Sequence, residues 1–137
     1  MAVDTIEKAI YYILANNGGV KALVVKRIYP TVASQLGTLP LIVYQQISGR
    51  REHTMTESVG LVESRYQVDC WATTYTGAQA LAKTVRVALD NHSGTTGTVK
   101  IEVIHLINEM DGIANIADAK IARRYRRLLE FIIWFQE

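Results

Sequence analysis

The sequence predicts a single α+β domain over residues 1–137, with a mainly antiparallel sheet of four to five strands and helices packed on one face. Three observations predict this fold. Residues 61–74 alternate apolar and polar side chains, as a strand with one buried face does. Residues 76–91 carry apolar side chains at helical spacing. Two further alternating segments, 98–108 and 120–135, complete the element order α-β-β-β-α-β-β.

The first helix is expected over residues 2–17, where apolar side chains recur every three to four positions. Asp4 is expected to cap its N-terminus, with Glu7 three residues later completing a capping-box-like pair. Gly18 and Gly19 are expected to end the helix, because glycine adopts the left-handed backbone conformation at little cost.

The segment between this helix and the clearest strand is less regular. Residues 20–25 are short and apolar, which fits a helix or a strand. Residues 26–29 predict a short strand that stops at Pro30. A second strand is expected over 40–47, with both faces apolar near its start. Residues 48–60 are so polar that we expect a long loop there, either functional or mobile.

The strand at 61–74 is predicted to bury one face, and the helix at 76–91 is predicted to lie close on the sheet through its alanines. The chain has one cysteine, Cys70, on the apolar face of that strand. We interpret it as a small core residue, because no histidine or acid neighbours it in a catalytic pattern.

A second apolar surface is predicted on the sheet face that the helices leave uncovered. Alternation along 61–74, 98–108 and 120–135 places several large apolar side chains there, and two tryptophans are among them. A patch of this kind usually marks a protein interface. We therefore predict that this face, or the sheet edge beside it, contacts a neighbouring subunit. The predicted interface residues are Trp71, Ile104, Leu106, Leu128, Ile132 and Trp134.

Five basic residues fall within eight positions near the C-terminus: Lys120, Arg123, Arg124, Arg126 and Arg127. In a strand, Arg124 and Arg126 point one way while Arg123 and Arg127 point the other, so they do not form a one-sided DNA-binding stripe. Two interpretations remain open. The arginines form salt bridges with acidic neighbours, or some of them line a channel that passes DNA.

Arg50 and Arg51, in the predicted loop at 48–60, offer the same two interpretations. The residues predicted to line a channel or contact a partner are therefore Arg50, Arg51, Arg124 and Arg126.

No residue pattern predicts a catalytic, cofactor-binding or metal site. The three histidines lack ligand spacing, and we interpret His105 as a core histidine. A net charge of +2 is too small to indicate nucleic-acid or membrane binding by net field. No apolar run is long enough to cross a bilayer, and the N-terminus lacks a signal-peptide pattern. The single cysteine fits synthesis in a reducing cytoplasm.

Three segments in order resemble one known family: LPLIVYQQISG at 39–49, RYQVDCWATTYTGAQALAKTVRVAL at 65–89 and RRLLEFIIWF at 126–135. They resemble the tail-completion, or tail-terminator, proteins of long-tailed phages. Each segment is a packing pattern, so the likeness rests on their joint order over nearly the whole chain. The sequence departs from the family at Cys70, where an aliphatic residue is more usual, and a core tolerates that change.

The resemblance implies a function. Tail-terminator proteins form a hexameric ring on the head-proximal end of the tail tube, stop tube growth and present a surface to the neck proteins of the head. DNA passes through the ring, and no catalysis is involved. The expected partners are therefore further copies of the chain, the tail tube protein and a head-completion or neck protein, with no membrane. The expected location is the virion, and residues 48–60 are expected to touch a neighbour or the tube.

Three other functions are the alternatives to a tail terminator. A connector or stopper on the head side of the neck belongs to the same class as the terminator. A nucleic-acid-binding module would use the arginine clusters and would show steeply salt-dependent DNA affinity. An enzyme would need a pocket with perturbed titratable groups, which the sequence does not indicate.

Overall fold

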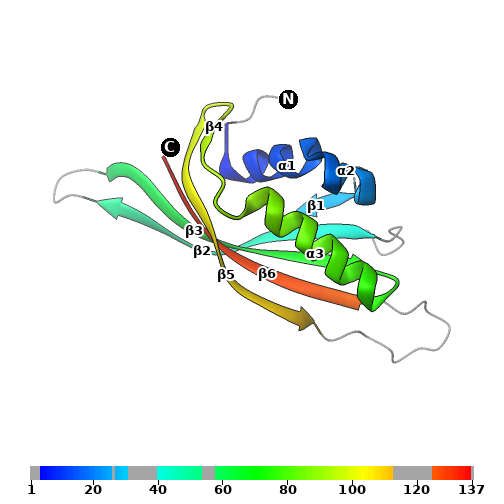
Figure 1. Ribbon diagram of the computed structural model, residues 1–137. Coiled ribbons are helices and arrows are strands. Elements are labelled where there is room, and N and C mark those ends of the chain that lie inside the picture. Colours follow the sequence, from blue (N-terminus) through cyan, green and yellow to red (C-terminus); the bar gives the residue numbers. More distant parts are fainter. Residues whose placement is uncertain (1–3, 26, 31–39, 54–57, 113–124, 137) are drawn as a thin grey trace.

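The computed structural model describes residues 4–25, 27–30, 40–53, 58–112 and 125–136. They form three helices and one six-stranded sheet (Figure 1). The helices are α1 (Ile6–Asn16), α2 (Gly18–Val24) and α3 (Tyr75–Leu89). The strands are β1 (Ile28–Pro30), β2 (Leu41–His53), β3 (Ser58–Ala72), β4 (Gly94–Thr96), β5 (Val99–Gly112) and β6 (Tyr125–Gln136). The α+β class is confirmed, but the prediction of four to five strands is wrong, because it lacked β4.

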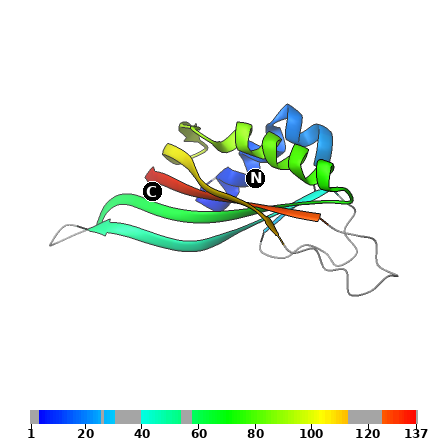
Figure 2. The same ribbon diagram turned by 60° about the horizontal axis from the view of Figure 1, so that its bottom comes forward.

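The strands lie in the order β1-β2-β3-β6-β5-β4. The β2–β3 and β5–β6 pairs are antiparallel, and β3 pairs with β6 at the centre, also antiparallel. Only β1 is parallel to its neighbour β2, which makes the sheet mixed. All three helices cover the same face of the curled sheet (Figures 1 and 2). No described helix lies on the other face, which we call the open face.

The hydrophobic core lies between the helices and the covered face of the sheet. The face predicted for β3 is confirmed, since Val62, Tyr66, Val68 and Cys70 are each at most 3% exposed. Apolar side chains of α3 and β6 complete this core. Burial raises the pKa of the Cys70 thiol far above its usual range, which fits a core residue and not a nucleophile.

The first helix begins later than predicted, and its predicted cap is wrong. The Thr5 side chain caps α1 by accepting a hydrogen bond from the Lys8 backbone N–H at 3.3 Å. Asp4 instead accepts from Lys8 Nζ at 2.9 Å. Glu7 does not complete a capping box, because its carboxylate accepts from the buried Tyr66 hydroxyl at 3.0 Å.

The glycine pair after α1 starts a helix instead of ending one. Asn17 ends α1 and also caps α2, accepting from the Val20 backbone N–H at 3.1 Å. Gly18 and Gly19 then form the first turn of α2. The Asn17 side chain therefore forms the junction between the two helices, where the sequence predicted a glycine in the left-handed conformation.

The long loop predicted at 48–60 is wrong. β2 continues to His53 and β3 begins at Ser58, and these strands pair along most of this segment. A β-bulge between Gln46 and Ser48 shifts the alternation, so the polar residues after it do not continue the pattern that marks the strand. The result is a hairpin that extends beyond the helices at one end of the sheet (Figure 1).

A second bulge overturns the predicted faces of β5. The register shifts between Ile101 and Val103, so the side chains after that point change faces. Ile104 is fully buried in the core beneath the helices, and Leu106 packs against that core. His105 is exposed on the open face, so its prediction as a core histidine is also wrong.

The predicted helix at 76–91 is confirmed as α3, capped by the Thr74 hydroxyl, which accepts from the Gly77 backbone N–H at 2.9 Å. The helix ends at Leu89, two residues before its predicted end. The chain turns at Asn91, which has a φ of 63°, and the backbone of residues 91 and 92 then hydrogen-bonds to Ile104 of β5.

Candidate functional site

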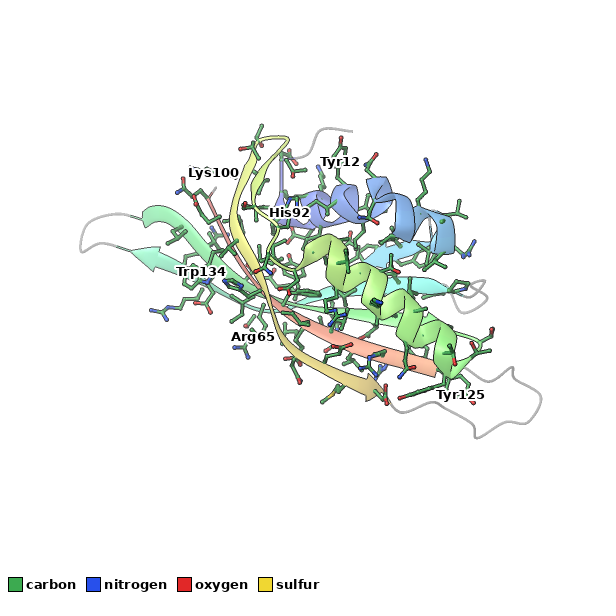
Figure 3. The ribbon with its side chains drawn as sticks, viewed as in Figure 1. Tyr12, Arg65, His92, Lys100, Tyr125 and Trp134 are labelled. Atoms are coloured by element: carbon green, nitrogen blue, oxygen red, sulfur yellow. The ribbon has the colours of Figure 1, made fainter. Side chains whose placement is uncertain are left out.

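The open face combines apolar ends with a polar middle. Residues opposite one another in register share a face, so the strand positions that alternate with the core residues lie on the open face. Across the middle of the sheet these are Gln45, Gln67, Glu130 and Asn108. Arg65 extends from this face on the side away from the helices (Figure 3).

One apolar end of the open face is organised around Trp71. The Arg126 guanidinium lies over its ring, 5.3 Å from the ring centroid. Arg126 also pairs with Asp69, with 3.9 Å between Nη1 and Oδ2. Gln67 donates to the Asp69 carboxylate at 2.8 Å. Burial outweighs these contacts and raises the pKa of Asp69 above its ordinary value.

The six predicted interface residues do not all share this face. Trp71, Leu128, Ile132 and Trp134 lie on the open face, as predicted. Ile104 and Leu106 lie on the opposite, helix-covered side, so their predicted placement is wrong. Leu128 is itself buried within the chain, and the other three are half-buried. The open face is therefore less apolar than the sequence predicted.

The basic residues are placed as the strand interpretation required. Arg126 and Arg127 lie on opposite faces of β6. Arg127 pairs with Glu109 at 2.9 Å and with Asp111 at 2.8 Å, and both carboxylates raise the pKa of its guanidinium. Salt bridging within the chain is thus confirmed for both arginines.

The remaining arginines fall on different surfaces. Arg50 pairs in register with Glu63 on the open face, and Arg51 pairs with Val62 on the helix side. Arg124 lies outside the described residues.

Arg51 contributes to an open hollow of about 700 Å³ between the start of α1 and the β2–β3 hairpin. Asp4, Glu7, Gln46 and Gln136 also line it, so its walls are largely polar. Among the described residues, no three His, Cys, Asp or Glu side chains are arranged to hold a metal ion. None of the described helices has the length and hydropathy to cross a membrane.

Sequence reasoning missed Asp69 as a special residue. It alternates regularly with its neighbours, so it reads as an ordinary solvent-facing strand residue, yet it is only 6% exposed. The one available signal was its position two residues before Trp71, because a large ring on the same face can cover a neighbour in its own strand.

We predict that Asp69→Asn changes how stability depends on pH. Because the pKa of Asp69 is raised in the folded state, the folded state keeps this proton at pH values where the unfolded state has released it. The stabilising contribution is complete below the unfolded pKa and is lost as pH rises through the folded pKa. The free energy of unfolding, measured with urea at about pH 3 and about pH 7, should therefore fall less between these two pH values for Asp69→Asn than for the unchanged protein.

Asp4 provides a matched control, because its pKa is shifted in the opposite direction from that of Asp69. Lys8 lowers the pKa of Asp4, so the contribution of Asp4 is present at neutral pH and is lost as pH falls. The free energies of unfolding of Asp4→Asn and of the unchanged protein should therefore become equal at low pH. Identical pH dependence in the unchanged protein and Asp69→Asn would contradict the account of Asp69.

Comparison with known proteins gives a family and a fold. The family model described as "Tail completion protein gp17" matches residues 8–135. A chain from a solved structure titled "Virion of native gene transfer agent (GTA) particle" is similar in fold, with a TM-score of 0.73 and 16% sequence identity. The likeness covers 93% of this chain and 92% of that chain. No curated protein matches the sequence.

Proposed function

Because this chain belongs to the tail completion protein gp17 family, we propose that it forms a ring at the head-proximal end of a phage tail tube. The ring stops growth of the tube and joins the tail to the head. The family match carries this proposal, because it spans residues 8–135 and so nearly the whole chain. The protein acts as a structural component and not as an enzyme.

The fold likeness to a chain of a gene transfer agent virion supports a place within a phage-like particle. The partners in this proposal are further copies of the chain, six in all, the tail tube protein, and a head-completion or neck protein. The chain is made in the host cytoplasm and is assembled into the virion. DNA passes through the ring without any reading of its sequence.

The shape of the subunit supports a ring. Helices cover one face of the sheet (Figure 2), and the residues across the middle of the open face are polar. Trp71, Leu128, Ile132 and Trp134 remain the candidate contact residues on the open face, and the sheet edges are the alternative contact surface.

Tube growth tests the function directly. Tail tube protein polymerises in the presence or absence of the purified chain, and tube lengths are measured in negative-stain images. The proposal predicts shorter tubes, each with a cap of added density at one end only. Unchanged tube lengths with bare ends would contradict it.

A further inference from the structure

We propose that neighbouring copies join edge to edge, with the outer edge of β2 in one copy pairing with the outer edge of β5 in the next. The sheets then close into one barrel, and the open face lines its opening. This inference rests on the proposed ring and adds which surfaces form the joint.

The outer edge of β2 is covered for only part of its length. β1 pairs with residues 42–44 alone. The bulge between Gln46 and Ser48 follows directly, and β2 then continues to His53. Within the described part of the chain, no strand pairs with the outer edge of β2 beyond Tyr44.

The outer edge of β5 is organised in the same way. β4 pairs with residues 99–101, and the turn after α3 covers the next positions. In that turn Asn91 and His92 hydrogen-bond to Ile104, and the Asp90 carboxylate accepts from the Leu106 backbone N–H at 3.0 Å. A bulge between Leu106 and Asn108 follows, and residues 107–112 have no described strand on their outer side.

Backbone alternation turns main-chain groups outward along both segments. The Ile42 N–H points to the β1 side, so Leu41, Val43 and Gln45 face β3, and the register beyond the bulge turns Gly49 and Arg51 outward. The same reasoning from Ile104 turns Asp111 outward on β5, and also Glu109, whose N–H donates to the Asn108 side chain at 3.0 Å. Each edge therefore offers N–H and C=O groups to a further strand.

Large apolar side chains are exposed on both segments. Ile47 is 46% exposed on the β2 edge, and Ile107 and Met110 are 41% and 48% exposed on the β5 edge. Proteins usually protect a free strand edge with charge, proline or a covering element, because it is a template for pairing. Bare segments that carry large apolar side chains indicate edges that are covered after assembly.

On the β5 edge, Glu109 and Asp111 both pair with Arg127, so two carboxylates share one cation in the part of the chain that the structure describes. Facing carboxylates would repel one another, which disfavours the pairing of two β5 edges. A head-to-tail joint of this kind closes into a ring when its rotation closes.

The stagger of the two edges suits a closed barrel. Leu41 of β2 is level with Gly112 of β5 across the sheet, so the free segments lie at opposite ends. Joining the two segments shifts each copy along the strand direction by about six residues, which is roughly 20 Å. The four strand spacings that each copy contributes around the barrel add up to roughly 19 Å across the strands. The strands then tilt by about 45°, close to the tilt of known closed barrels. The short strands β1 and β4 do not block the joint, because they cover the other segments.

Cysteine cross-linking tests the joint. The double variant Arg51→Cys/Glu109→Cys is treated with a short bismaleimide, alone and on tail tubes, and is checked for an unchanged melting transition. The native Cys70 is fully buried and stays unmodified. The inference predicts a ladder of covalent oligomers that ends at the ring, whereas each single variant gives no ladder. Ile132→Cys, on the open face, should give no cross-linked dimer.

The outcomes separate this inference from the proposed function. Rings in images together with a ladder support the edge joint. Rings without a ladder, or dimers from Ile132→Cys, overturn the edge joint and leave the tail-terminating ring standing. If neither rings nor capped tubes form, both the joint and the proposed function are overturned.

Discussion

Replacing Ile104 with aspartate is expected to abolish cooperative folding, while the same change at Ile132 leaves a folded protein. Ile104 is fully buried in the core, where a carboxylate would have no charged partner. Such a substitution costs about 4–5 kcal/mol or more. A typical domain has only about 5–15 kcal/mol of stability in total, so most of it would be lost.

Ile132 provides the matched control on the neighbouring strand. Its register partners on the open face are Arg65 and His105, which can stabilise a carboxylate there. Strict alternation along the sequence places Ile104 and Ile132 on the same face, whereas the bulge in β5 places them on opposite faces. The two substitutions therefore distinguish strict alternation from the bulged strand. Far-UV circular dichroism and thermal melting give the readout. Equal effects of the two substitutions would contradict the bulge in β5.

Replacing Gly49 with proline is expected to leave the subunit folded and to weaken its assembly by at least tenfold. The Gly49 N–H points to the outer edge of β2, so proline there removes no hydrogen bond to β3. A side chain at Gly49 meets the end of the Gln46 side chain, which can move aside. Proline at this position would, however, block a strand from pairing on that edge.

Arg50→Pro is the matched control for the hairpin. The Arg50 N–H faces β3 opposite Glu63, so proline at this position should lower the melting temperature of the subunit itself. Sedimentation at several concentrations measures assembly, and thermal melting measures folding. Gly49→Pro assembling as well as the unchanged protein would contradict the role of the β2 edge.

The fold class followed from the sequence because the pattern of β3 and α3 is regular. Val62 to Ala72 alternates with only Ser64 interrupting the apolar face, and the apolar stripe of α3 is uninterrupted, so both elements were predicted within a few residues. The errors lie where a bulge or a capping side chain changes the local rule. Bulges leave no signature in a single sequence, so the assumption of strict alternation predicted the wrong face of the sheet for Ile104.

The candidate site was predictable only in part. Trp71 and Trp134 were placed correctly, because no bulge interrupts the pairing of β3 with β6. The free edges were not predictable, because they depend on which strands end up outermost and on how little of them β1 and β4 cover. That is a property of the three-dimensional pairing and not of any one segment.

The mass of the purified protein, alone and mixed with phage tail tubes, tests the central claim most directly. Light scattering combined with negative-stain images gives both the mass and the shape. The account predicts a ring of about six chains of 15.3 kDa each, free or seated on one end of the tubes. A stable monomer that ignores the tubes would contradict it.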